Sequence, residues 1–392
     1  MVIKLFSYRI FYVSFFIISC LLFACAPPKA TVQKQPEILN PMQQFEQKLE
    51  SMRKAYNVPG MSVAILKEQE VVFNRGFGYA DLENKIPATE NTPYNIASLT
   101  KPFGATILMN LVEEAQLSLD DAMADILNET DFKYGDHSAQ GYADLCKKIR
   151  KLAWLYGSLL WDYRCHTEKI LVRHHLTHTS QGMPGERYRY NGFLFTFLSK
   201  VAEKTSGKAF DELLVEKIIA PLEMTRTIPS INEERRSQTL KHRAKYYQIG
   251  PFGGFVSSKY PVRLSTSAGM VSTVVDIAKF DVAMDRNEII SKESKETMYT
   301  PTISTSGKIL PYGLGWFVQE YKGIEMVWHY GYAPKAYSSL ILKIPEKELT
   351  MILLANSDGA SRGFNLGNGN VLNSPFARLF VNMFIDTKTI RQ

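Results

Sequence analysis

The 392-residue chain has only four cysteines and lacks several patterns that would fix its class. It contains no internal repeat and no low-complexity tract, and nowhere do aromatic and basic residues alternate as they do in nucleic-acid-binding surfaces. We therefore expect no nucleic-acid partner. A hydrophobic content of 45% is enough for a large core, which excludes a disordered protein and predicts one composite domain or two interleaved ones.

Metal-ligand patterns are equally scarce. His174, His175 and His178 lie close together, but no Asp, Glu or Cys stands near them at ligand spacing. We interpret these histidines as core or structural residues. The sequence predicts neither a metal nor an organic cofactor.

Residues 1–24 have the layout of a secretory signal peptide. Lys4 and Arg9 precede an apolar run that starts at Ile10, and small residues and a cysteine follow. The stretch LFAC, which ends at Cys25, resembles a bacterial lipoprotein box, although Phe23 departs from the usual small or branched residue.

The anchoring cysteine has two candidates, because IISC, which ends at Cys20, fits the same box. We favour Cys25 since more apolar residues follow Cys20. An uncleaved helical anchor is the alternative, but the run is at the short edge for spanning a bilayer. We expect an exported chain, held at a membrane of the cell envelope by lipid on Cys25, with residues 25–44 as a tether.

Cys146 and Cys165 would then be the pair left in the mature protein, and an even pair in an exported protein is a candidate disulfide. Their segment has helical apolar spacing and a basic run, KKIRK. That run is either a solvated helix face or a surface for anionic envelope polymers or lipid headgroups. The net charge of +7 agrees with the second reading without deciding it.

Strand patterns stand at both ends of the chain. Residues 60–81 give two β runs around a polar turn, and residues 312–331 and 336–357 give two runs each, followed by an apolar helix candidate, PFARLFVNMFI. The middle is mainly helix and loop. We predict an α/β fold of the α+β kind, with an antiparallel sheet from both chain ends flanked by helices and a mostly helical region inserted between them.

Ser98 and Lys101 stand three positions apart in SLTK, at the start of a predicted helix. Pro102 is tolerated only in a first turn, so the helix should begin near Ser98. There the macrodipole and free amides favour a developing negative charge, and Lys101 shares the face of Ser98. A capping serine followed by a surface lysine is the alternative.

A competing nucleophile is Ser361, because residues 359–363 match the G-x-S-x-G elbow. The segment after it is rich in Gly and Asn rather than helical, and all seven histidines precede it. The downstream histidine that the elbow requires is absent, so we reject this candidate.

Four stretches occur in order: SLTK at 98–101, LTHTSQGMPGERYRYNG at 176–192, STSAGMVSTVVDIAKF at 265–280 and WHYGYAP at 328–334. Together they resemble the serine β-lactamase-like family, in the branch of class C β-lactamases, D-aminopeptidases, D-alanyl-D-alanine carboxypeptidases and family VIII esterases. The resemblance covers residues 45–392 and implies a β-lactamase/transpeptidase-like fold with an insertion near residues 129–170.

The resemblance also implies roles. Ser98 would attack a carbonyl while Lys101 and Tyr190 manage its proton. The branch has Lys-Thr-Gly or His-x-Gly where this chain has His329 and Gly331, which would line the opposite, substrate-binding wall. The oxyanion hole carried over would be the backbone N–H groups of Ser98 and Tyr332.

Lysine and tyrosine need tuning for these roles, because their ordinary pKa values of about 10.4 and about 10 are too high for a base at neutral pH. We expect the clustered pair to share a proton, with the ammonium favouring tyrosinate and burial disfavouring the lysine charge.

One position departs from the family pattern. The branch usually has Tyr-x-Asn, whereas here Gly192 follows Tyr190 and Asn191. In the family that Asn helps to hold the lysine and the substrate amide, so its loss weakens the expectation of lactam and D-peptide cleavage more than that of ester hydrolysis. A shift of register that lets Asn191 replace it is the alternative.

The sequence thus predicts an exported serine hydrolase that acts through an acyl-enzyme on an ester or a D-amino-acid peptide or amide, with a small-molecule or peptide substrate. A class C β-lactamase is the alternative enzyme. An alternative of another class is a catalytically weak envelope lipoprotein that binds peptidoglycan peptides.

Overall fold

The computed structural model describes residues 40–127, 168–261 and 263–385. The predicted signal peptide, the four cysteines and most of the predicted insertion therefore lie outside the described residues. The chain separates into two compact units, Met1–Gln43 and Gln44–Gln392. All contacts discussed below belong to the second unit.

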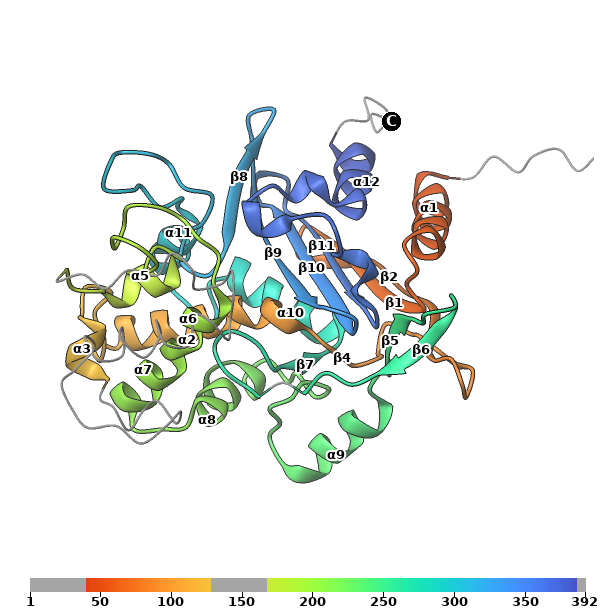
Figure 1. The fold of residues 1–392 in the computed structure, drawn as a ribbon, viewed down its shortest axis with the longest axis horizontal. Coiled ribbons are helices and arrows are strands. Elements are labelled where there is room, and N and C mark those ends of the chain that lie inside the picture. Colours follow the sequence, from red (N-terminus) through yellow and green to blue (C-terminus); the bar gives the residue numbers. More distant parts are fainter. Residues whose placement is uncertain (1–39, 128–167, 262, 386–392) are drawn as a thin grey trace, which may run out of the picture. The chain divides into compact units, whose positions relative to one another are not determined.

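The described residues build one large antiparallel sheet from both ends of the chain, as predicted. Its strand order is β3-β2-β1-β11-β10-β9-β8 (Figure 1). The strands are β1 Gly60–Lys67, β2 Glu70–Asp81, β3 Ile86–Pro87, β8 Phe317–Tyr321, β9 Ile324–Ala333, β10 Tyr337–Ile344 and β11 Leu349–Ala355. Pairing of β1 with β11 joins the N-terminal strands to the C-terminal ones.

Short turns set the register of these strands. Glu68 and Gln69 between β1 and β2, and Lys322 and Gly323 between β8 and β9, all have positive φ. Two-residue turns of this hand match the twist of antiparallel strands. Every residue of β10 and β11 is buried, so both faces of the central sheet are covered.

Helices cover the sheet and fill the middle of the chain (Figure 1). On the sheet, α10 packs against β1 and β11, and Phe45 of α1 packs against Phe73 and Phe384. The longer helices are α1 Pro41–Ala55, α2 Thr100–Glu113, α7 Phe197–Ser206, α9 Glu233–His242, α10 Val274–Asp285, α11 Lys292–Tyr299 and α12 Pro375–Phe384. The shorter ones are α3 Met123–Ile126, α5 Val172–Leu176, α6 Gly192–Phe195, α8 Phe210–Leu214 and the single turns η1 Ala97–Leu99, η4 Val215–Ile219, η5 Pro345–Lys347, η6 Asp358–Ala360, η7 Leu366–Asn368 and η8 Val371–Asn373.

Helix α2 is the central helix, because every residue from Thr100 to Leu111 is buried. Its Phe103 stacks on Phe280 of α10 with ring centroids 3.9 Å apart. Within the described ranges, no helix combines the length and the apolar character that crossing a membrane requires.

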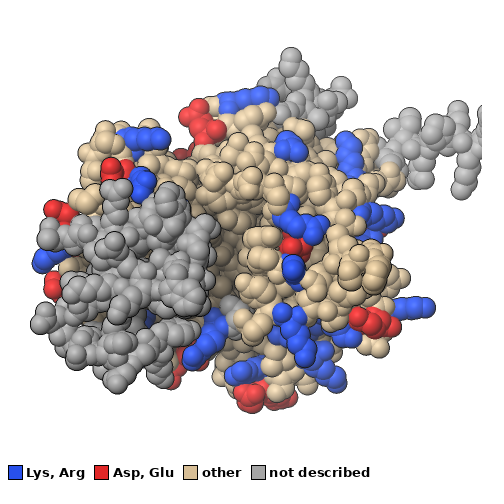
Figure 2. Space-filling view, in the orientation of Figure 1, with Lys and Arg blue, Asp and Glu red and all other residues tan. Residues whose placement is uncertain are grey.

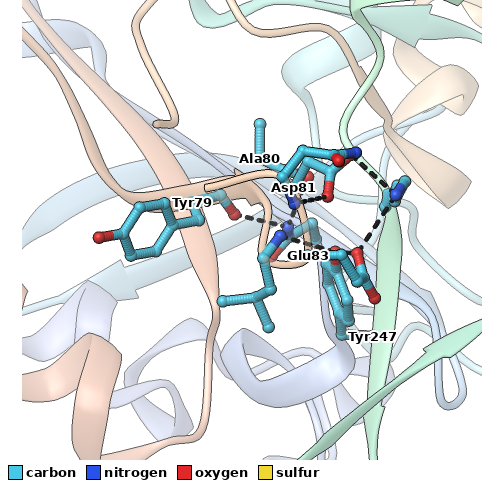
Figure 3. A network of polar contacts seen from close by, with 9 residues as sticks. Tyr79, Ala80, Asp81, Glu83 and Tyr247 are labelled. Atoms are coloured by element: carbon cyan, nitrogen blue, oxygen red, sulfur yellow. Dashed lines mark hydrogen bonds and ion pairs between the residues drawn. The ribbon is translucent and has the colours of Figure 1, made fainter. Parts of the chain in front are cut away.

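Two small sheets complete the fold: β4 Tyr94–Asn95 with β7 Val271–Ser272, and β5 Tyr246–Ile249 with β6 Phe255–Ser258. Polar contacts fix the base of the β5–β6 hairpin to the end of β2 (Figure 3). The Tyr247 hydroxyl donates to Glu83 at 2.6 Å, and Lys245 pairs with Asp81 at 2.8 Å. The base of this hairpin is packed, with Tyr246 and Tyr247 buried, whereas Phe252 between the two strands is fully exposed.

Candidate active site

Ser98 lies in η1, the turn that leads directly into α2. The helix therefore starts two residues later than Ser98, and Lys101 and Pro102 occupy its first turn. The preceding residue, Ala97, has a left-handed φ of 49°, a conformation that costs a non-glycine residue about 1 to 2 kcal/mol. This bend places the Ser98 side chain, which is only partly buried, at the positive end of α2.

Lys101 is completely buried and lies against Ser98. Its Nζ is 3.0 Å from Ser98 Oγ, 3.0 Å from Ser267 Oγ and 3.1 Å from the Ser267 carbonyl oxygen. No carboxylate pairs with it among the described ion pairs, and burial lowers the pKa of Lys101 to about 7. A substantial fraction of Lys101 is therefore neutral at physiological pH and can accept the Ser98 proton.

Tyr190 presents its ring rather than its hydroxyl to the lysine. Lys101 Nζ lies over the Tyr190 ring, 5.0 Å from the centroid. The buried Tyr190 hydroxyl has no hydrogen-bond partner with good geometry among the described residues. Burial, reinforced by Tyr330 and opposed by Ser98, raises the pKa of Tyr190 well above its usual value.

These positions correct the expected sharing of a proton. Tyrosinate was expected beside an ammonium, but burial and the neighbouring Tyr330 raise the pKa of Tyr190, which disfavours the tyrosinate form. Tyr190 keeps its proton at neutral pH, and Lys101 is the group that can act as base.

Strand β9 passes directly beside η1 and carries the predicted wall. Gly331 is required there for space, because a Cβ at this position would lie 2.2 Å from the Ile96 carbonyl oxygen and 3.0 Å from Ala97 Cβ. Tyr332, the next residue, is 38% exposed. The roles predicted for the Ser98 and Tyr332 amides stay predictions.

The His329 side chain lies behind this wall and is fully buried. Its Nδ1 contacts the Tyr330 carbonyl oxygen at 2.8 Å, so Nδ1 carries the proton and Nε2 accepts from the Tyr312 hydroxyl at 2.9 Å. Burial and the Lys101 charge hold the pKa of His329 well below its usual value. His329 is thus a neutral support for the aromatic rings that surround Tyr190.

The centre of the face that Figure 2 shows is hollowed, over the region where β9 lies in Figure 1. A buried lysine beside a partly exposed serine, at the end of a helix and opposite a strand edge, is an arrangement suited to nucleophilic attack on a carbonyl.

A sequence profile described as Beta-lactamase matches residues 45–373. The chain belongs to the beta-lactamase family. This family consists of serine hydrolases with the fold described above, as the sequence motifs predicted.

Several relatives are similar to this beta-lactamase-family chain. A D-aminopeptidase of Gluconobacter oxydans (strain 621H) is 26% identical over 78% of this chain and 57% of its own length. Penicillin-binding protein 4* of Bacillus subtilis (strain 168) is 26% identical over 74% of this chain and 66% of its own length. The solved octameric penicillin-binding protein homologue from Pyrococcus abyssi is 27% identical, with a TM-score of 0.66, over 82% of this chain and 75% of that one. This chain thus spans less than two thirds of the length of the two curated relatives.

Asn191 does not replace the amide that the family pattern places at position 192. Its Nδ2 donates to Gln181 at 2.9 Å, and its Oδ1 accepts the Leu194 N–H at 3.1 Å as the cap of α6. The alternative register is therefore wrong for this chain. A Cβ at Gly192 would instead lie 3.6 Å from Lys101 Nζ, so position 192 is the one that faces the lysine.

The rejected sites have structural roles. Ser361 is buried and donates to the Gly331 carbonyl oxygen at 3.1 Å. His174 accepts the Leu171 N–H, and His175 contacts the Ser180 hydroxyl at 3.2 Å. Over the part of the chain that the structure describes, no three His, Cys, Asp or Glu side chains gather to hold a metal ion.

Sequence reasoning missed two neighbours of Tyr190. His178 packs on the Tyr190 ring with centroids 4.5 Å apart, although its histidine-rich stretch was interpreted only as structural. The η7 turn reaches the same ring, since a Cβ on Gly367 would lie 3.8 Å from Tyr190 Cβ. Only the glycine-rich composition of residues 363–369 signalled such a close approach.

Proposed function

We propose that this chain is an exported, lipid-anchored serine hydrolase that forms an acyl-enzyme on Ser98. The observation that carries the proposal is the 3.0 Å contact between Ser98 Oγ and a completely buried Lys101 Nζ. The small-molecule or peptide substrate would be an ester or a D-amino-acid peptide or amide. Export and lipidation rest on the N-terminal sequence.

In the acylation step, neutral Lys101 accepts the hydroxyl proton as Ser98 Oγ bonds to the substrate carbonyl carbon. The oxyanion that forms would be held by the Ser98 and Tyr332 backbone N–H groups. Collapse of the intermediate breaks the bond to the leaving group, which leaves with a proton from Lys101 or from the protonated Tyr190. A proton given up by Tyr190 is replaced from Lys101, so that Lys101 is neutral again and takes a proton from the water that attacks the acyl-enzyme carbonyl carbon. Collapse of this second intermediate breaks the bond to Ser98 Oγ, releases the acid and returns the proton to Ser98.

Ester hydrolysis is the activity that the site supports best. Gly192 supplies no side chain at the position where the family pattern has an amide. A missing hydrogen-bond partner costs about 1 to 3 kcal/mol, or roughly tenfold to a hundredfold in rate when the contact forms in the transition state. An activated ester depends less on this contact, because its leaving group needs little protonation and it has no acylamide N–H to position.

The test is intact mass of the wild type and of Ser98→Ala after treatment with a fluorophosphonate and, separately, with a penicillin. We expect a fluorophosphonate adduct that maps to the peptide containing Ser98 in the wild type and is absent in the variant. We also expect hydrolysis of short p-nitrophenyl esters to be lost in the variant, with an unchanged circular dichroism spectrum.

Three results would contradict the proposal. Equal labelling of Ser98→Ala would show that another residue is the nucleophile. Cephalosporin turnover at or above esterase activity would favour the β-lactamase alternative, whereas a wild type that binds peptidoglycan peptides without ester turnover would favour the binding protein.

A further inference from the structure

The Ser267 hydroxyl occupies the space beside Lys101 that Gly192 leaves open. Ser267 Oγ lies 3.0 Å from Lys101 Nζ, and a Cβ on Gly192 would lie 3.1 Å from Ser267 Oγ. A larger side chain at position 192 and the present Ser267 rotamer therefore compete for one volume. Beside Lys101, the Ser267 hydroxyl therefore stands where Gly192 provides no side chain.

The backbone of Ser267 is held by its own turn. Its N–H donates to Ser265 Oγ at 3.2 Å, and the Ser265 N–H donates to the Ala268 carbonyl oxygen at 2.8 Å. Thr266 ties the turn to the neighbouring helices, since its N–H donates to Ser199 Oγ and its hydroxyl to the Phe195 carbonyl oxygen, both at 2.8 Å. The Ser267 carbonyl oxygen is thus held by the turn before any substrate binds, and the Ser267 hydroxyl is held by its contact with Lys101 Nζ.

The number of N–H donors on Lys101 indicates what the two Ser267 oxygens do. Neutral Lys101 has two N–H donors and one lone pair, and the described structure offers it three close oxygens. When the two N–H groups donate to Ser267 O and Ser267 Oγ, the lone pair is directed at Ser98 Oγ. When the amine is protonated, its third N–H donates to Ser98.

We propose that the Ser267 hydroxyl is a positioning residue that, together with its own carbonyl, orients the Lys101 amine toward Ser98 in place of a side chain at position 192. This inference rests on the proposed function. It assigns a role to a residue 166 positions away from the lysine, which acts on Ser98 through the lysine amine.

The test compares Ser267→Ala, Gly192→Asn and the double variant Gly192→Asn/Ser267→Ala. Ser272→Ala is the matched control, because Ser272 is also a buried serine, and its hydroxyl contacts Thr227 at 2.8 Å and not Lys101. Two quantities are measured: the pH dependence of kcat/KM for a p-nitrophenyl ester, and the pKa of Lys101 by ¹³C NMR of labelled lysine, assigned with Lys101→Met.

In Ser267→Ala we expect the plateau of kcat/KM to fall about tenfold, because the amine keeps only one fixed acceptor. The Lys101 pKa should also fall, since the charged form loses one of its three acceptors, so the acid limb of the profile moves to lower pH. Gly192→Asn alone should be impaired by crowding at Ser267. The double variant should recover most of the lost rate, and its lactam turnover should exceed that of the wild type.

An unchanged Lys101 titration and an unchanged profile in Ser267→Ala would overturn the inference. So would an equal effect of Ser272→Ala, which would mean a general loss of packing. If the wild type showed no ester turnover, the proposed function would be contradicted but not the role of Ser267. The NMR titration of Ser267→Ala would still show whether the Lys101 pKa depends on the Ser267 hydroxyl.

Discussion

Lys101 shows how burial can change the chemistry of a single residue. An exposed lysine is an acid at neutral pH, whereas this one lies in a pocket of rings and hydroxyls in which burial lowers its pKa to about 7. The sequence could predict the pair with Ser98, because both are on one helical turn. It could not predict Ser267 as a partner, because a contact over 166 positions depends on tertiary structure.

At the residue scale we predict that acylation is controlled by deprotonation of Lys101. Only the neutral amine accepts a proton, so the rate of ester acylation should rise through pH about 7 and then reach a plateau. Stopped-flow measurements of p-nitrophenol release between pH 5.5 and 9 would show this rise of the acylation rate with pH. A rate that is flat across this range would contradict a lysine base.

The same group makes stability depend on pH. Because the pKa of Lys101 is lower in the folded state than in the unfolded chain, the unfolded state binds more protons between pH about 7 and about 10. The loss of folding free energy caused by burying Lys101 is therefore largest below pH 7, and it becomes smaller as the pH rises toward 10. Lys101→Met should therefore gain most in Tm over the wild type at pH 6 and least at pH 9.5.

At the scale of secondary-structure elements, the close contact between β9 and η1 fixes the distance between the Ser98 turn and the opposite wall of the site. The hairpins were predictable from alternating patterns and short turns, and so was the helix after Ser98. The left-handed φ of Ala97 could not be predicted, because alanine does not favour that conformation. The contact with Gly331 could not be predicted either, because it joins segments more than 200 residues apart in the sequence.

We predict that Gly331→Ala separates these two elements. Its Cβ would lie 2.2 Å from the Ile96 carbonyl oxygen, which is backbone and can move only with η1. Ester turnover should fall at least a hundredfold and Tm should drop by several degrees.

The matched control is Gly323→Ala. Gly323 has a left-handed backbone, with φ of 79°, but no heavy atom lies within 4 Å of a Cβ placed at this position. It should lose stability through backbone strain, by about 1 kcal/mol, and keep its activity. If both variants lost activity equally, the close approach of β9 to η1 would not be what sets the site.

For the whole molecule, the catalytic unit can be argued from the described residues, but its place in the cell depends on the first 39. The two-ended sheet was predictable because both ends carry strand patterns, whereas the pairing of β1 with β11 needed the structure. The N-terminal apolar run ends in a lipoprotein-like box, followed by a polar segment that leads to α1. An enzyme tethered in this way would act only within reach of the membrane surface.

The corresponding prediction is that the mature chain begins at Cys25 and carries lipid there. Cys25 is followed by AlaProPro and a polar segment, whereas Cys20 is followed by Leu21, Leu22 and Phe23, which suit the apolar core of a signal rather than the start of a mature protein. When the protein is expressed in a bacterium, incorporation of a labelled fatty acid should be lost in Cys25→Ser and kept in Cys20→Ser. The Cys25→Ser protein should keep its p-nitrophenyl esterase activity, because the site lies in the unit Gln44–Gln392. Labelling that instead depends on Cys20, or an unmodified N-terminal peptide that begins elsewhere, would assign the anchor differently or remove it.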